Sequence, residues 1–120
     1  MKYSFLEIVD NVLKSTLKCE SKHTSFTDAL FERLNENKSK VLLVDSDSGR
    51  EWTAHELEEK IVTLSIRFLQ LGIAKGDVVA CFCPNSDFQV ITMISLWSIG
   101  AIYTALYYKS PISESIIKVQ

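Results

Sequence analysis

Residues 75–86 read KGDVVACFCPNS, and this stretch decides the fold class. Its apolar run, 78–83, is typical of a strand in a parallel sheet that is covered on both faces. Pro84-Asn85-Ser86 ends the strand, and Asn85 or Ser86 can cap the helix that we expect over 86–99. A second buried strand is expected over 101–106. A strand, a helix and a strand in this order predict a right-handed crossover between parallel strands.

A helix and a two-stranded hairpin are predicted directly upstream of this stretch. Thr53-Ala54-His55-Glu56 has the pattern of a capping box, in which the threonine oxygen accepts from a free amide of the first helical turn. We therefore expect a helix that begins here and ends at Gly72. Before it, 41–44 predicts a short buried strand, and 50–53 can return beside it across the turn 45–49.

Further towards the N-terminus, the spacing of apolar residues predicts two more helices. Ser25 or Thr27 can cap a helix that ends near 35–37. In residues 1–24 the apolar positions recur at helical spacing, with acidic residues between them, and this favours an amphipathic helix over a secretory signal. A mitochondrial presequence is also disfavoured, because the segment contains no arginine.

Together these elements predict an α/β fold with a mostly parallel sheet and covering helices. We divide the chain into an N-terminal amphipathic helix or extension, 1–24, and part of a larger domain, 25–120. Ser113 can cap a final helix, and the sequence stops within two turns of that start. We therefore expect the chain to be truncated in its last helix.

Composition excludes several classes of function. Among 120 residues there are 13 lysines and arginines against 15 aspartates and glutamates, so the net charge is −2 with both signs interleaved. This argues against a nucleic-acid partner, which needs a clustered basic patch. Three cysteines make an odd number without a disulfide pattern, so we expect an intracellular protein.

The uncharged run 88–108 is long enough to span a bilayer. It contains six small or polar interruptions, at Gln89, Thr92, Ser95, Ser98, Gly100 and Thr104. Gly100 is a natural helix stop, so we read the run as a buried helix followed by a buried strand. No transmembrane span is therefore expected, although a small membrane-associated protein stays open as a weaker alternative.

Candidate chemical groups are few. No glycine belongs to a G-x-G-x-x-G or G-x-x-x-x-G-K phosphate loop. Cys81 and Cys83 lie two residues apart, on one face of a strand. The second pair of ligands that a zinc site needs is missing, so we expect buried, inert thiols. The helix N-terminus at Pro84-Asn85-Ser86 follows a parallel strand, which is the usual place for ligand contact in α/β sheets.

Five other residues are interpreted as structural. Cys19 has no base nearby in the sequence, and His23 and His55 are isolated at helix starts. Asp45 and Asp47 flank a turn and lack the spacing and terminal glutamate of a calcium loop. We therefore assign no catalytic, cofactor-binding or metal-binding residue.

The order and spacing of short motifs are more specific than any of them alone. The motifs are Val41–Asp45, Gly49-Arg50-Glu51-Trp52-Thr53, Glu56-Leu57, Leu71-Gly72-Ile73, Lys75-Gly76-Asp77-Val78-Val79-Ala80, Pro84-Asn85-Ser86, Gly100-Ala101-Ile102-Tyr103 and Leu106. This series resembles the N-terminal part of the adenylate-forming (AMP-binding) superfamily, which includes acyl-CoA synthetases, 4-coumarate–CoA ligases and luciferases. The resemblance covers roughly 25–120.

The resemblance implies a parent reaction in which a carboxylic acid attacks ATP, with Mg²⁺ assisting, and coenzyme A then takes the acyl group. That family's phosphate loop, its Tyr-Gly-x-Thr-Glu motif, its ribose-binding aspartate and its C-terminal lysine are absent from these 120 residues. We therefore expect a fragment of an ATP-dependent acid–thiol ligase that is inactive alone, in the cytoplasm or peroxisome. The alternative is a non-catalytic interaction module that docks on a full-length paralogue.

Overall fold

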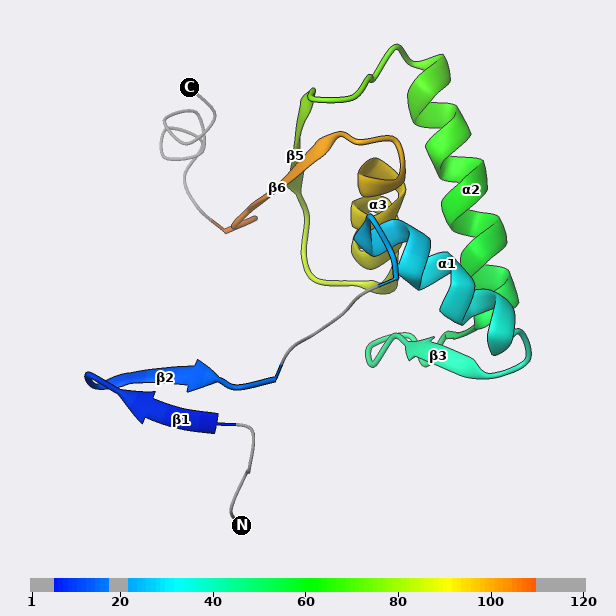
Figure 1. Cartoon of the computed structure of the whole chain (residues 1–120). Helices are drawn as coiled ribbons and strands as arrows, with labels where there is room; N and C mark the ends of the chain where they lie inside the picture. The colour runs from blue at the N-terminus through cyan, green and yellow to red at the C-terminus, as the bar shows by residue number, and fades with distance from the viewer. Residues whose placement is uncertain (1–5, 18–21, 110–120) are drawn as a thin grey trace.

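The computed structural model describes residues 6–17 and 22–109. Cys19 and the final helix expected after Ser113 lie outside the described residues. The described elements follow one another in the order β1 (Leu6–Val9), β2 (Val12–Ser15), α1 (Phe26–Glu36), β3 (Val41–Val44), β4 (Glu51–Thr53), α2 (Ala54–Gln70), β5 (Val78–Phe82), α3 (Asp87–Ser98) and β6 (Ile102–Leu106). The α/β class expected from the sequence is confirmed (Figure 1).

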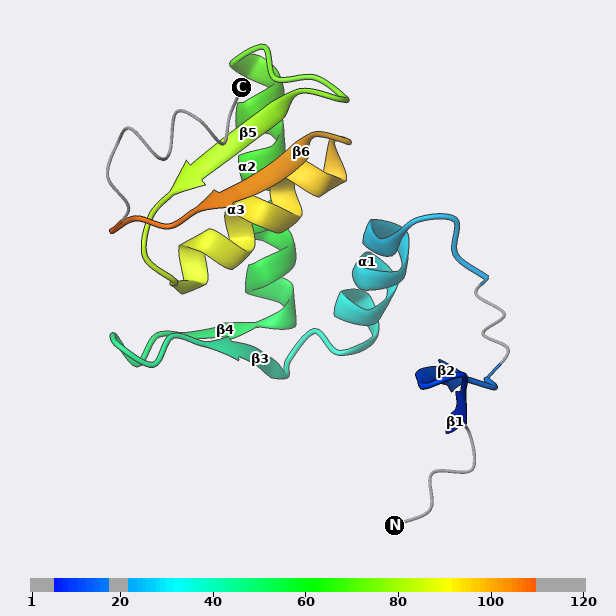
Figure 2. The same ribbon diagram turned by 90° about the vertical axis from the view of Figure 1, so that its left-hand side faces the viewer.

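The predicted crossover is the centre of this arrangement. β5 and β6 pair in parallel, in a register that runs from Val78 opposite Ile102 to Phe82 opposite Leu106. The connecting helix α3 lies against the strand pair, and α2 lies beyond α3 (Figure 2). The strand–helix–strand unit read from residues 75–106 is thus confirmed.

The expectation of a mostly parallel sheet covered on both faces is wrong for the described residues. The strands form three separate pairs, of which β5–β6 is parallel and the other two are antiparallel. On β5–β6, Val78, Phe82 and Ile102 are at least half exposed. The reason is visible in Figure 2, where the helices lie on one side of the pair.

The helix boundaries follow the local signals closely. Ser25 and Ser86 cap α1 and α3, and each side-chain oxygen accepts an amide hydrogen bond three residues along. Thr53 and Glu56 form the complete capping box that begins α2. At the other end of α3, Gly100 has a φ of +76°, a backbone conformation that glycine adopts without steric cost.

The hydrophobic core lies between the helices, around Leu34, Leu57, Ile61 and Ile91. Small residues allow α2 and α3 to approach closely. Ser65 and Ser95 are buried where the two helices cross, and the Ser65 hydroxyl donates to the Ser95 carbonyl at 3.1 Å. The Ser95 hydroxyl donates to the carbonyls of Ile61 and Ile91, so these buried polar groups are satisfied.

The hairpin β3–β4 is confirmed, but its first strand is not buried. Val41 and Val44 are about half exposed, at 45% and 55%, and Leu43 packs against the core. A four-residue strand at the edge of a two-stranded pair has one neighbour, so most of its side chains stay at the surface.

The amphipathic helix expected in residues 1–24 is wrong where the structure describes that segment. β1 and β2 form an antiparallel hairpin with Val9 opposite Val12. Asp10 and Asn11 both have positive φ, 52° and 61°, the backbone of a two-residue type I′ turn. Turn chemistry at these two residues, together with β-branched neighbours, outweighed an apolar spacing that also fits a helix. Among residues 6–17 and 22–109, no helix has both the length and the apolar character needed to cross a membrane.

A candidate ligand cavity beside the parallel strands

A cavity of about 530 Å³ opens where β5 and β6 end. Parallel strands direct their carboxyl ends to the same edge, and this edge is where α/β sheets bind ligands. The volume falls in the range of small-molecule pockets. The lining residues are Asp47, Cys83, Pro84, Asn85, Gln89, Ala105, Leu106, Tyr107 and Tyr108. Pro84 and Asn85, whose position after a strand suggested ligand contact, therefore do line a cavity.

The N-terminus of α3 beside this cavity already has acceptors for its first-turn amides. The Gln89 amide donates to the Ser86 hydroxyl, and the Phe88 amide donates to the Asp87 carboxylate at 2.8 Å. A helix N-terminus attracts anions through such amides and through its dipole. Here Asp87 itself supplies the negative charge, so these two amides are not available to a ligand.

Asp87 is the most heavily bonded side chain near the cavity. One carboxylate oxygen accepts from the Arg50 guanidinium and from the Trp52 indole, both at 2.8 Å. Arg50 also lies over the Phe88 ring, 4.7 Å from its centroid. These contacts attach the β3–β4 hairpin to the first turn of α3.

The protonation of Asp87 follows from these partners. Burial raises the pKa of its carboxyl group, but the Trp52 indole, the Phe88 amide and the Arg50 charge together outweigh burial. The net result is a pKa below the usual value, so Asp87 is ionised at neutral pH.

Deeper along the strands, Gln89 of α3 donates to the Tyr103 hydroxyl of β6 at 3.0 Å. Burial is the main cause that raises the Tyr103 pKa above its usual value.

Cys81 and Cys83 are half-buried free thiols with their sulfurs 3.2 Å apart. The hydrogen bond between them is the main cause that raises the Cys83 pKa. The expected common face of the two cysteines is confirmed, whereas full burial is not.

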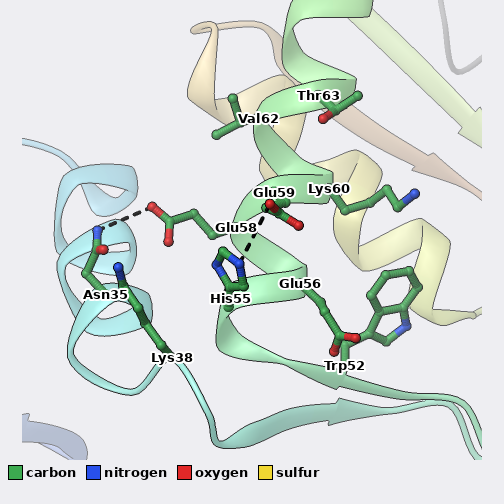
Figure 3. A pocket seen from close by; sticks show the side chains of 10 residues that line it. All are labelled: Asn35, Lys38, Trp52, His55, Glu56, Glu58, Glu59, Lys60, Val62 and Thr63. Atoms are coloured by element: carbon green, nitrogen blue, oxygen red, sulfur yellow. Dashed lines mark hydrogen bonds and ion pairs between the residues drawn. The ribbon is translucent and has the colours of Figure 1, made fainter.

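A larger hollow, of about 800 Å³, lies between α1 and α2 (Figure 3). It is lined by Asn35, Lys38, Trp52, His55, Glu56, Glu58, Glu59, Lys60, Val62 and Thr63. Four of its polar side chains form two pairs: Asn35 donates to Glu58 at 3.3 Å, and His55 lies 3.7 Å from Glu59. Glu56 is held in the capping box, which is the main cause of its lowered pKa. These contacts account for the polar side chains in the hollow, because they stabilise α2. We therefore place the candidate site at the strand edge.

The remaining residues weighed from the sequence have structural roles. His23 lies 2.7 Å from the Glu32 carboxylate. Asp45 accepts from the backbone and the hydroxyl of Ser48 and so closes the β3–β4 turn. Within residues 6–17 and 22–109, no three histidine, cysteine, aspartate or glutamate side chains lie close enough to hold a metal ion.

Sequence reasoning missed the contacts that organise this edge. Asp87 is 37 residues from Arg50 and 35 from Trp52, so no local pattern joins them. A signal did exist in part, because an acidic residue directly after a helix cap complements the helix dipole. The pairing of Gln89 with Tyr103 depends on the crossover and carries no sequence signature of its own.

The chain has an α/β architecture with a candidate ligand cavity at the strand edge, and comparison with known proteins identifies the family. The AMP-binding enzyme family matches residues 30–115, so the chain belongs to this family. Members are ATP-dependent and include acyl-CoA synthetase-like ligases that bind carboxylic acids and CoA. The resemblance read from the motif series is confirmed.

Individual relatives agree with this assignment. The chain is 33% identical over 89 residues to an acetyl-coenzyme A synthetase of Dictyostelium discoideum, a match that covers 68% of this chain and 13% of that protein. Among solved structures, the N-terminal subdomain of Klebsiella oxytoca NpsA in complex with 3-hydroxybenzoyl-AMSN matches with a TM-score of 0.69 and 27% identity, over 78% of this chain and 23% of that one. A Mycobacterium tuberculosis fatty acyl CoA synthetase shares the fold, with a TM-score of 0.71 at 18% identity, over 78% of this chain and 19% of that one. The chain thus spans about an eighth of the curated relative and under a quarter of these structures.

Proposed function

We propose that these 120 residues supply scaffold to an ATP-dependent acid–thiol ligase and do not catalyse the reaction on their own. The parent reaction is adenylation of a carboxylate followed by acyl transfer to coenzyme A. The match of residues 30–115 to the AMP-binding enzyme family carries this proposal. The absence of glycine-rich phosphate-loop patterns from the sequence supports the second half of it.

The described residues fit a scaffold role. Asp87, which a ligand-binding site could use, is already occupied by Arg50 and Trp52. Its bonds hold a hairpin against a helix, and the strand edge is shaped by that contact. ATP, Mg²⁺ and coenzyme A are the cofactors we propose for the complete enzyme. We assign none of them to a residue of this chain, because no metal-holding cluster is found in the part that the structure describes.

The test is ATP–pyrophosphate exchange by the purified chain with acetate, fatty acids and aromatic acids. We expect no exchange above a blank without protein, while a complete acyl-CoA synthetase in the same buffer gives a clear signal. Circular dichroism on the same sample establishes that the chain is folded. Exchange that depends on both the chain and the acid would contradict the proposal. The intact mass of the cellular protein adds an independent check on the fragment hypothesis, which expects a mass several times 13.6 kDa.

A second candidate is a non-catalytic module that docks on a full-length paralogue. The exposed apolar side chains of Val78, Phe82 and Ile102 favour it, because they form a contiguous uncovered face on paired strands. Native mass spectrometry of the chain mixed with a full-length ligase of the same organism tests it. A one-to-one complex that Phe82→Glu abolishes would support docking, and a failure to associate would reject it.

For localisation we propose the interior of the cell, in the cytoplasm or the peroxisome. The support is the odd cysteine count without a disulfide pattern and the likeness to ligases, one of which, from Arabidopsis thaliana, is described as peroxisomal. Fractionation of cells that express the tagged native gene product tests this. Recovery from the culture medium would contradict it.

A further inference from the structure

Cys81 and Cys83 form a pre-arranged pair of thiols at the end of β5. Cys81 is in the strand and Cys83 follows its last residue, so both side chains leave the same face. Their sulfurs are 3.2 Å apart, and both side chains are half-buried rather than sealed in the core. Cys83 also lines the strand-edge cavity, so a small molecule in the cavity can reach this sulfur.

The spacing of the sulfurs decides which soft ligands they suit. With bonds to sulfur of about 2.3 Å, a linear two-coordinate ion needs sulfurs about 4.6 Å apart, whereas a bond angle near 90° needs about 3.3 Å. The observed 3.2 Å fits the right-angled case. Structural zinc needs four ligands, and no third histidine, cysteine or acidic residue joins the pair among the described residues.

We propose that Cys81 and Cys83 are a bidentate site for trivalent arsenicals that carry one organic group. Such an arsenic centre is pyramidal, bonds two sulfurs at an angle near 90°, and keeps its third position for the organic group. In the reaction two S–H bonds and the arsenic–oxygen bond break, two arsenic–sulfur bonds form, and one water leaves with the oxygen and both protons. Arsenic stays trivalent, so no oxidant or reductant is needed.

The surroundings of Cys83 also favour this ligand. Leu106, Tyr107 and Tyr108 line the same cavity as Cys83 and offer apolar surface to an organic group on arsenic. Inorganic arsenite lacks this group and requires a third thiol to complete its bonding, so we expect it to bind more weakly.

Phenylarsine oxide is the probe, and mass spectrometry of the intact native chain is the measurement. We expect one adduct per chain, with the mass of a phenylarsenic group less two hydrogens, removed by excess ethanedithiol. Cys81→Ser and Cys83→Ser should each lose the adduct, while Cys19→Ser, at the third cysteine of the sequence, should keep it. Retention by either of the first two variants, or loss by the third, would overturn the assignment.

The contribution of the folded geometry is measured separately. The adduct on the native chain should withstand about tenfold more ethanedithiol than the adduct on the chain in denaturant, because a pre-arranged pair loses less freedom on binding. Equal sensitivity in the two states would mean that closeness in sequence, rather than the folded site, holds the arsenical. Circular dichroism of the serine variants checks that a lost adduct does not reflect unfolding.

Discussion

Replacement of Asp87 by asparagine tests the contact that joins the hairpin to α3. The side chain is about 1% exposed and accepts three hydrogen bonds at 2.8 Å, from Arg50, Trp52 and the Phe88 amide. An asparagine has one acceptor oxygen, so in either orientation at least one part-buried N–H group loses its acceptor. Such a loss costs about 1–3 kcal/mol, and removal of the negative charge from the helix N-terminus adds up to about 1 kcal/mol. Arg50 is 43% exposed and regains water, so its lost ion pair adds little.

We therefore expect Asp87→Asn to lower the free energy of unfolding by about 1–4 kcal/mol. With a urea m-value of about 2 kcal/mol/M, the unfolding midpoint should fall by roughly 0.5–2 M. The matched control is Asp47→Asn, an exposed aspartate in the β3–β4 turn, for which we expect a change within about 0.5 kcal/mol. A loss below about 0.5 kcal/mol for Asp87→Asn would refute the reasoning.

The pH dependence gives an independent check on the same residue. The pKa of Asp87 is lowered in the folded state, so its contribution is complete above the ordinary aspartate value of about 3.9 and disappears as the pH falls through the folded value. The difference in stability between the natural chain and Asp87→Asn should thus be constant from about pH 5 to 7 and shrink below about pH 4. A difference that persists unchanged in acid would show that the carboxylate charge is not the cause.

Three further predictions address other elements. Gly100→Ala should lower the free energy of unfolding by about 1–2 kcal/mol more than Gly49→Ala does. Both glycines have positive φ, but of the two only Gly100 has a neighbouring side chain within 2.9 Å of an added methyl group. Equal losses in urea melts would contradict this. Ser95→Leu places a large side chain in the buried helix crossing and should destabilise the fold by about 1–3 kcal/mol. Ser98 is half-buried on the same helix, so Ser98→Leu should be less destabilising when both variants are compared by thermal melting. Cys83 should react slowly with iodoacetamide at neutral pH and faster as the pH rises, because its pKa is raised; a rate at pH 7 equal to that of free cysteine would reject this.

The parts of the fold that the sequence predicts are those set by local chemistry. The capping box at Thr53, the cap at Ser86 and the stop at Gly100 each act within four residues, and each lies where it was expected. The parallel pairing of β5 and β6 follows from the order of elements and the handedness of crossovers.

What the sequence could not predict depends on contacts between distant residues or on competition between two patterns. Residues 6–15 fit a helix by apolar spacing and a hairpin by the turn residues Asp10 and Asn11, and no single-sequence rule weighs one against the other. The exposed outer face of β5 shows a second limit. An apolar strand predicts that it is covered, but it does not reveal which part of a protein covers it.

The same few residues shape the candidate cavity and stabilise the fold, and this affects how binding should be studied. Asp87 holds the hairpin that carries Asp47, and Asp47 lines the cavity, so a variant of Asp87 would change stability and the cavity together. Tyr107 is exposed and lines the cavity without a buried hydrogen bond among those described, so Tyr107→Ala separates the two effects. If Tyr107→Ala loses binding of a ligand while its stability is unchanged, the loss can be attributed to the cavity itself. The same loss in Asp87→Asn cannot, because its stability changes as well.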